Sequence, residues 1–306
     1  MSDEYVANHV RNLVAMMGFD MRKSLRDRDL ELEAKVMDKL MELGLSSTDS
    51  KKPLERFLKS GCLLASLYYR HHPTDAKVYT AIHAILLLGV DDYFSDVSLT
   101  RTFAHKFGTR KAQGHPLLDC VARLLRDETP KIFGPFTTNM IITSTLDGIN
   151  GFSLEATFPR GFLRAMPGFS CWLRSCTGWS AAYACFIFPN TKFPESEYLG
   201  RYVQIMPNLR DIICYVNDIL SFYKERVVAK EGCFISNLAQ EKSMDDYSTL
   251  ALVCDYVLSL DKEIREFLAE DEIILGAYAD FMLGYMEWHF QVERYRLNEL
   301  GLTLKS

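Results

Sequence analysis

The sequence predicts an all-α protein with a single domain, and three observations support this fold class. Apolar residues recur at helical spacing along most of the 306 residues, whereas the alternation typical of β-strands is nearly absent. Hydrophobic residues make up 48% of the chain, enough for a sizeable core in one domain over residues 1–306. No internal repeat and no low-complexity linker divides the chain, so we expect ten or more helices in one unit.

The predicted helices follow one another along the chain. The helix at 29–44 has its apolar residues on one face and ends at Gly44, which suits a C-terminal cap. The polar stretch 46–53 is predicted as a turn. Further helices are predicted at about 54–70, 75–90, 115–127, 135–146, 160–186, 195–225, 246–268 and 273–298. Pro207 lies within one of these segments and should kink or split it, because proline removes a backbone donor.

Composition and charge exclude several classes of function. The net charge is −5, so the chain lacks the basic surface that nucleic acids and anionic membranes attract. The N-terminal segment has no secretory core, and no apolar run approaches the roughly 18 residues of a membrane span. The eight cysteines contain no CxxC pair, which favours buried thiols in a reducing compartment over a zinc site. We therefore expect a soluble, cytoplasmic protein with no nucleic-acid partner and no membrane span.

Acidic residues follow a strongly apolar predicted helix. Asp91 and Asp92 come directly after it, and Asp96 follows about one turn later. Carboxylates at this end of a helix are disfavoured by the helix dipole unless a cation is present. If the helix continues, Asp92 and Asp96 share a face and could hold hard divalent cations through oxygen. The alternative interpretation is a solvated acidic helix end.

A second set of oxygen-bearing side chains lies in CYVNDILSFYKER, residues 214–226. Asn217, Ser221 and Glu225 are spaced four residues apart, so they form one gently drifting stripe along a helix. Amide, hydroxyl and carboxylate oxygens are hard ligands that suit Mg²⁺. A solvent-facing stripe is the alternative, but such stripes are usually built from Lys and Glu rather than set among Ile, Leu and Tyr.

Basic residues occur in two unusual settings. Arg174 lies in the apolar and aromatic segment WLRSCTGW, where an unpaired charge would be costly. Arg294, Tyr295 and Arg296 follow a very aromatic helix and offer donors to phosphate oxygens. A structural salt bridge and a surface basic cluster are the respective alternatives. Together with the two oxygen-ligand clusters, these residues indicate a site for a metal-chelated polyanion beside an apolar, aromatic pocket, as an isoprenoid diphosphate requires.

These motifs resemble those of class I terpene cyclases, and specifically of the fungal trichodiene synthase family. The family's second metal motif, (N/D)Dxx(S/T)xx(K/R)(D/E), is matched at every position by Asn217, Asp218, Ser221, Lys224 and Glu225. The segment 284–300 resembles the one that carries the family's basic motif. The resemblance covers roughly residues 60–300, with the motifs in the family's order and spacing.

The resemblance extends to the segment around Arg174. Class I cyclases carry a diphosphate-sensing arginine before the second metal motif, and Arg174 stands 43 residues before Asn217, a distance that fits. Bacterial relatives follow that arginine with a linker residue and an effector glycine, and Thr177 and Gly178 occupy those positions here. With Asp91, these are the residues to which the resemblance assigns catalytic roles.

The resemblance implies a class I terpenoid synthase bundle of helices around an apolar active-site cavity. It further implies Mg²⁺-dependent loss of diphosphate from farnesyl diphosphate and cyclisation of the allylic cation to a sesquiterpene hydrocarbon or alcohol. Three Mg²⁺ ions are expected, with ligands Asp91, Asp92, Asp96, Asn217, Ser221 and Glu225. The expected diphosphate-binding residues are Arg174, Lys224, Arg294 and Tyr295. Candidates for the pocket wall are Phe57, Tyr68, Tyr79, Tyr93, Trp172 and Trp288, but packing in the core is the favoured interpretation for most of them.

Departures from the family pattern keep rival functions open. Ser95 replaces an aspartate of the first cluster and Glu293 replaces an arginine of the basic motif, as in a degenerate, non-catalytic isoprenoid-binding or interaction protein of the same fold. The intact second metal motif argues against that alternative. A chain-elongating prenyltransferase would need a second DDxxD cluster, but the other Asp pair, at 245–246, is predicted to cap a helix. The family resemblance favours a homodimer, while the oligomeric state stays open.

Overall fold

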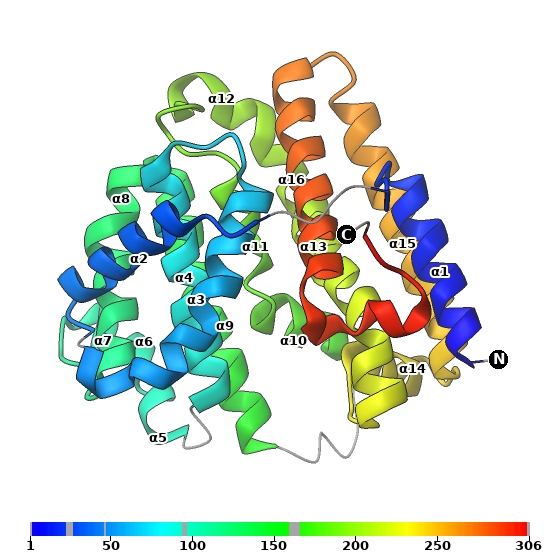
Figure 1. Cartoon of the computed structure of the whole chain (residues 1–306), viewed down its shortest axis with the longest axis horizontal. Helices are drawn as coiled ribbons and strands as arrows, with labels where there is room; N and C mark the ends of the chain where they lie inside the picture. Colours follow the sequence, from blue (N-terminus) through cyan, green and yellow to red (C-terminus); the bar gives the residue numbers. More distant parts are fainter. Residues whose placement is uncertain (1, 23–26, 46, 94–96, 159–165, 305–306) are drawn as a thin grey trace.

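Helices form the regular secondary structure in this computed structural model, which describes residues 2–22, 27–45, 47–93, 97–158 and 166–304 (Figure 1). The α-helices are α1 (Ser2–Met16), α2 (Leu30–Glu42), α3 (Ser47–Tyr68), α4 (Thr74–Tyr93), α5 (Val97–Thr100), α6 (Phe103–Gly108), α7 (Pro116–Arg123), α8 (Thr129–Ile132), α9 (Pro135–Thr157), α10 (Phe169–Thr177), α11 (Ser180–Phe186), α12 (Glu195–Tyr202), α13 (Met206–Phe222), α14 (Phe234–Lys242), α15 (Asp246–Phe267) and α16 (Glu272–Gln291). Short π-helical and 3₁₀ segments are η1 (Leu124–Glu128), η2 (Val203–Ile205), η3 (Tyr223–Ala229), η4 (Glu293–Tyr295) and η5 (Leu297–Leu300). The described residues contain no strand, which confirms the all-α prediction.

Several predicted boundaries are confirmed by the caps that set them. Gly44 follows α2 with a φ of +85°, the left-handed conformation expected of a glycine cap. The Asp245 side chain accepts hydrogen bonds from the backbone N–H groups of Tyr247 and Ser248 and so caps α15, as predicted. Pro207 is the second residue of α13, after the 3₁₀ turn η2, so the predicted split of the long segment is confirmed.

Other predictions of local structure were wrong. The stretch predicted as a polar turn belongs from Ser47 onward to α3, a helix that begins without the apolar period that marks most helices. Helix α9 runs to Thr157, beyond the predicted end at 146. Helix α1 was not predicted, although it buries Val6, Val10 and Leu13 at helical spacing, and it packs against α15.

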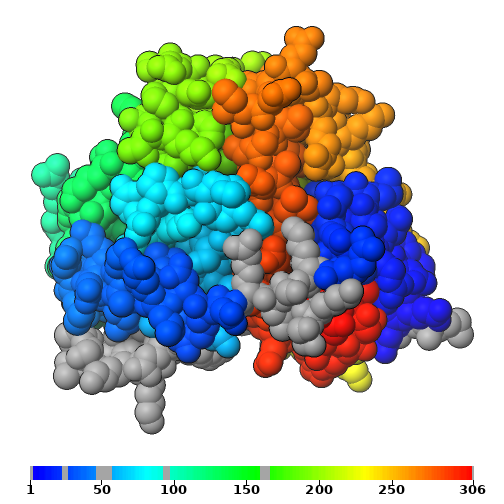
Figure 2. All heavy atoms as spheres, turned by 45° about the horizontal axis from the view of Figure 1, so that its top comes forward, coloured from blue at the N-terminus to red at the C-terminus, as the bar shows by residue number. Residues whose placement is uncertain are grey.

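The helices pack around one another rather than in two flat layers. Helix α3 packs against α4 and α16, and α13 packs against α11 and α15. Figure 1 places α13 and α16 in the middle of the bundle, with α11 between them and the α3–α4 side and with α9 and α10 lower in the view. Figure 2 shows the C-terminal turns, in red, next to α1, in deep blue, in agreement with the contact between α1 and η5. Among the helices described, none combines the length and the apolar character needed to cross a membrane.

Candidate active site

The site is organised around α13, whose apolar side chains bury the helix in the bundle. Val216, Ile219 and Leu220 are fully buried. Two polar side chains of the same helix are buried with them, because Asp218 is 7% exposed and Ser221 is 2% exposed. Burying such groups is costly unless they have polar partners, so their neighbours define the site.

Arg174 is the partner of Asp218 and also reaches Asn217. Its Nε donates to both carboxylate oxygens of Asp218 at 2.9 and 2.8 Å, and its Nη2 donates to Asn217 Oδ1 at 3.1 Å. Burial raises the pKa of Asp218 to about 6, and the facing guanidinium opposes that rise. Burial alone would lower the pKa of Arg174, but the Asp218 carboxylate raises it. The structure therefore brings the predicted sensor arginine onto the predicted metal motif.

The other side of Asn217 is held by two residues near the end of the chain. His289 is 1% exposed and burial lowers its pKa to about 3, so the imidazole is neutral. Its Nδ1 lies 2.7 Å from the Tyr285 carbonyl, which can only accept, so Nδ1 carries the proton and Nε2 accepts. Asn217 Nδ2 then donates to His289 Nε2 at 3.0 Å and to Tyr295 Oη at 3.1 Å. These contacts fix the amide so that Oδ1 faces Arg174.

Sequence reasoning missed His289. A histidine within the apolar segment EWHFQ was the available signal, but an isolated histidine in such a helix is common in cores. Its role is apparent only from the contact with Asn217, 72 residues away in sequence.

Lys224 and Glu225 lie where α13 changes to the π-helix η3. The wider π-helical turn reduces the rotation per residue, so it limits the drift of Glu225 away from the line of Asn217 and Ser221. The Lys224 ammonium pairs with the Glu225 carboxylate and lies 5.6 Å from the Tyr295 ring centre. Burial raises the pKa of Tyr295 to about 12, so its hydroxyl stays protonated. The structure thus brings all three predicted ligands of this motif to one region of the bundle.

Of the first acidic cluster, the structure describes the side chain of Asp91 alone. Asp91 is exposed in the last turn of α4. Glu155, at the end of α9, is exposed, yet partial desolvation raises the pKa of its carboxyl; the charge of Arg174 opposes this rise and that of Asp91 adds to it, so the three charges interact. Sequence reasoning had not singled out Glu155. Asp92 is the penultimate residue of α4, but its side chain, like all of Asp96, lies outside the described part of the chain.

The predicted linker and effector positions lie at a break between helices. Thr177 ends α10, and α11 begins at Ser180. Gly178 lies so close to α13 that an added Cβ would meet Cys214 Sγ at 2.6 Å and Arg174 Nη1 at 3.0 Å. The Thr177 methyl packs in the same way against Gly151 of α9. Only glycine fits at 178, so the break is packed directly onto Arg174.

The basic motif contributes residues of two kinds. Arg294 is exposed beside the buried Tyr295, and its charge lowers the pKa of that hydroxyl against the effect of burial. Arg296 instead pairs with Glu299 at 2.7 Å, so its charge is already compensated within the chain.

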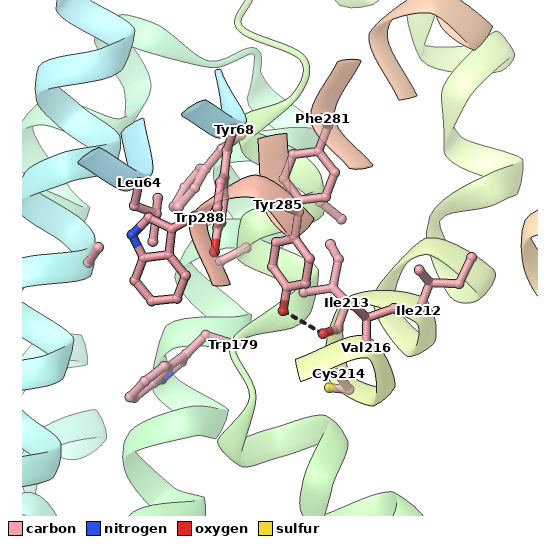
Figure 3. Packing of buried hydrophobic residues seen from close by; sticks show 14 of the residues in the cluster. Leu64, Tyr68, Trp179, Ile212, Ile213, Cys214, Val216, Phe281, Tyr285 and Trp288 are labelled. Carbon is pink, nitrogen blue, oxygen red and sulfur yellow. Dashed lines mark hydrogen bonds between the residues drawn. The ribbon is translucent and has the colours of Figure 1, made fainter. Parts of the chain in front are cut away.

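An aromatic cluster lies beside this polar network. The Tyr68 ring is 4.9 Å from Tyr285, 5.6 Å from Phe281 and 5.8 Å from Trp288, measured between centroids. Tyr285 donates to the Ile213 carbonyl at 2.7 Å and so ties α16 to α13 (Figure 3). Trp288 donates to the Ser60 carbonyl at 3.0 Å, which ties α16 to α3.

The predicted pocket-wall residues divide into three groups. Tyr68 and Trp288 belong to this aromatic cluster. Phe57 and Tyr79 are buried in the core, and the Tyr79 hydroxyl bonds Thr129 Oγ1 at 2.7 Å. The prediction for Trp172 was wrong, because its side chain is 54% exposed on the outer surface of α10. The Tyr93 side chain lies outside the described residues.

A sequence model of trichodiene synthase (TRI5) matches residues 34–303. The chain belongs to the trichodiene synthase family. Its relatives include an (E)-beta farnesene synthase of Metarhizium brunneum, 26% identical over 94% of this chain and 87% of that protein. A longiborneol synthase of Gibberella zeae is 28% identical over 91% of this chain and 86% of that protein. The chain is thus a terpene synthase, a carbon–oxygen lyase.

Solved structures show that this terpene synthase has the class I fold. The linalool/nerolidol synthase of Streptomyces clavuligerus aligns with a TM-score of 0.64, covering 89% of this chain and 99% of its own. A cucumene synthase variant aligns with a TM-score of 0.59. Sequence identity is only 13% and 14%, so these comparisons concern the fold alone.

Class I terpene synthases generally use Mg²⁺, and the donors of this terpene synthase suit that ion. Within the part of the chain that the structure describes, no three His, Cys, Asp or Glu side chains gather in a metal-binding group. Asn217 and Ser221 instead supply neutral oxygens beside the Glu225 carboxylate. Such mixed oxygen donors suit Mg²⁺, which retains waters and takes further ligands from substrate phosphate.

Proposed function

We propose that the protein catalyses the Mg²⁺-dependent cyclisation of farnesyl diphosphate to a sesquiterpene hydrocarbon or alcohol, with release of diphosphate. The observation that carries the proposal is the contact between Arg174 and the Asn217–Asp218 pair. It joins a strong donor to the proposed metal ligands across 43 residues of sequence.

The substrate class follows from the combination of the polar network and the aromatic cluster. The donors and ligands at one end suit a diphosphate, while the rings of Tyr68, Tyr285 and Trp288 suit an apolar chain. Names of relatives support a C15 substrate, because farnesene, longiborneol and cuprenene are sesquiterpenes. Another relative is named a monoterpene synthase, so a C10 substrate must be tested beside it.

Three Mg²⁺ ions are proposed at the polar end. Asn217, Ser221 and Glu225 would hold one, and Asp91, Asp92 and Asp96 would hold the other two. When bound, Mg²⁺ neutralises diphosphate charge and so favours its departure. The Lys224–Glu225 pair would have to open so that the carboxylate can bind metal and the ammonium can bind the diphosphate.

The donors of the chain would act directly on the leaving group. Arg174 is held by Asp218 in one orientation, so it is positioned before the substrate arrives. Lys224, Arg294 and the Tyr295 hydroxyl would add donors, and the Tyr295 oxygen already accepts from Asn217, which leaves its own proton to donate. Gly178 and Thr177 join Arg174 to the α10–α11 break. A movement of Arg174 on diphosphate binding would therefore shift this break inside the bundle. The enclosed aromatic interior would keep water from the allylic cation.

Purified protein should be incubated with geranyl, farnesyl and geranylgeranyl diphosphate, each with and without Mg²⁺. The organic extracts are then analysed by gas chromatography–mass spectrometry. We expect a C15 product from farnesyl diphosphate that requires Mg²⁺. Asn217→Ala should abolish it, whereas Asn208→Ala, at the start of the same helix, should not.

A folded protein that yields no product from any of the three substrates would overturn the proposal in favour of the degenerate binder. Circular dichroism establishes that each variant is folded. Elongated diphosphates in the aqueous phase after adding isopentenyl diphosphate would instead indicate a prenyltransferase.

The setting of the enzyme is also proposed. All eight cysteines are free thiols, six of them buried, which supports a reducing compartment such as the cytoplasm. We treat residues 1–306 as one catalytic domain and expect a homodimer. Size-exclusion chromatography with light scattering tests the dimer.

A further inference from the structure

The residue after Gly178 is held in an unusual way. Trp179 has φ +44° and ψ +19°, a left-handed conformation that bulky residues rarely adopt. Such an outlier persists only where the surrounding structure imposes it, and it often marks a functional position. Trp179 is also 8% exposed, so the strain supports a buried ring rather than a surface turn.

The indole carries a second unfavourable feature. Its Nε1 is buried and finds no acceptor among the described residues. A buried donor without a partner destabilises the folded state. Phenylalanine would remove this cost and glycine would remove the backbone strain, so the tryptophan is kept against two unfavourable contributions to stability.

Helix α9 makes room for this ring. A Cβ added to Gly148 would meet Trp179 Nε1 at 1.8 Å, so the indole edge lies directly against the bare backbone of α9. Phe152, one helical turn further along α9, lies 4.8 Å from the indole between ring centroids. The ring is therefore locked by α9 on one edge, which fixes where its exposed face can point.

The locked ring is connected to both halves of the proposed site, through the chain to the polar half and through the bundle interior to the aromatic half. Trp179 follows directly on Gly178, which touches Arg174 and α13. Figure 3 shows its indole, on the ribbon of the α10–α11 break, in the same interior as Trp288, Tyr68 and Tyr285. A prenyl diphosphate with its diphosphate at Arg174 and its chain among these rings would place its allylic carbons at this junction.

We propose that the Trp179 indole forms the wall beside the allylic end of the substrate, stabilises the cation there and so helps to determine the product. This inference rests on the proposed function. Tryptophan has the aromatic face most favourable to a cation, which explains why it is retained despite the strain and the unpaired N–H. The proposed ligand is the allylic cation of a prenyl chain.

The test compares Trp179→Phe and Trp179→Leu, with Trp172→Leu as the matched control. Phe keeps an aromatic face, Leu keeps apolar bulk only, and Trp172 is an exposed tryptophan of the neighbouring helix. We expect Trp179→Leu to lower product formation about 10-fold and to change the ratio of acyclic to cyclic products. Trp179→Phe should lose less activity, and Trp172→Leu should leave rate and product ratio unchanged. Equal product ratios in wild type and Trp179→Leu would overturn the inference.

Binding supplies a readout that needs no turnover. Indole fluorescence is followed while farnesyl thiolodiphosphate, an unreactive analogue, is added with Mg²⁺. Trp288 also lies among the rings proposed to hold the chain, so the titrations are done in the Trp288→Phe background. A change seen in Trp288→Phe and in Trp288→Phe/Trp172→Phe but absent in Trp288→Phe/Trp179→Phe places the Trp179 indole against the chain. A change that persists in Trp288→Phe/Trp179→Phe would overturn the inference. If the wild type makes no product but shows the fluorescence change that depends on Trp179, the proposed function is wrong and the contact between Trp179 and the prenyl chain is confirmed.

Discussion

The polar and aromatic ends of the proposed site are held together by different forces. At the polar end, Arg174, Asn217 and His289 are linked by hydrogen bonds of 3.0–3.1 Å that depend on the identity of single atoms. At the aromatic end, Tyr68 and Phe281 meet through ring contacts near 5.6 Å that depend on shape and area. Directional contacts fail when one atom is replaced, whereas apolar contacts weaken gradually. Changes of equal size should therefore have larger effects at the polar end.

The largest effect is expected for Arg174→Lys. Lysine keeps the charge but cannot donate to Asp218 and Asn217 at once through a rigid fork. We expect product formation from farnesyl diphosphate to fall about 10²–10³-fold, as for the loss of one positioned donor. Arg210→Lys, at a half-buried Arg–Asp pair of α13, is the control and should change little. A loss below tenfold would contradict the role given to Arg174.

The next effect concerns His289→Phe. This variant removes the acceptor that orients the Asn217 amide while keeping a ring of similar size. We expect the Mg²⁺ concentration for half-maximal activity to rise about 10–100-fold, as when a partner of a metal ligand is lost. Saturating Mg²⁺ should restore much of the rate. An unchanged Mg²⁺ dependence, with the exposed His105→Phe as reference, would show that Asn217 is held without His289.

The third prediction concerns His83, a histidine at the aromatic end whose burial makes the stability of the fold depend on pH. His83 is fully buried, and burial lowers its pKa to about 3, below the 6.5 of the unfolded chain. As the pH falls below 6.5 the unfolded chain binds a proton first, so stability decreases. Between pH 6.5 and 5.0 this amounts to about 2 kcal/mol.

His83→Gln removes the imidazole that takes up a proton on unfolding. Glutamine can still form a hydrogen bond with Thr145, which His83 Nε2 contacts at 3.0 Å. Urea unfolding at the two pH values should show a smaller loss of stability in the variant by about the same 2 kcal/mol. Identical losses in both proteins would mean that His83 does not titrate on unfolding in this window.

The smallest effect is expected for Tyr285→Phe. The ring and its contacts remain, and only the bond to the Ile213 carbonyl is lost. The free energy of unfolding should fall by about 1 kcal/mol, measured by urea titration, with the exposed Tyr256→Phe as control. A loss several times larger would show that this single bond, rather than ring packing, joins α13 to α16.

The sequence by itself determined the helical class, most helix positions and the polar stripe of α13. Helical periodicity and caps such as Asp245 are local, so they can be read without knowing the neighbours. The spacing of Asn217, Ser221 and Glu225 is local for the same reason. Arg174 was recognisable because a charge in an apolar segment needs a partner somewhere.

Only the tertiary structure decided which residues meet. The packing of distant helices decides that His289 orients Asn217. It also decides that the charge of Glu155 interacts with those of Asp91 and Arg174, and that Trp172 is exposed. The left-handed Trp179 depends on this packing too, since its conformation is set by Gly148 and α9 rather than by its own preference. Local propensities do not encode such contacts, because burial and partners of a side chain are properties of the packed bundle.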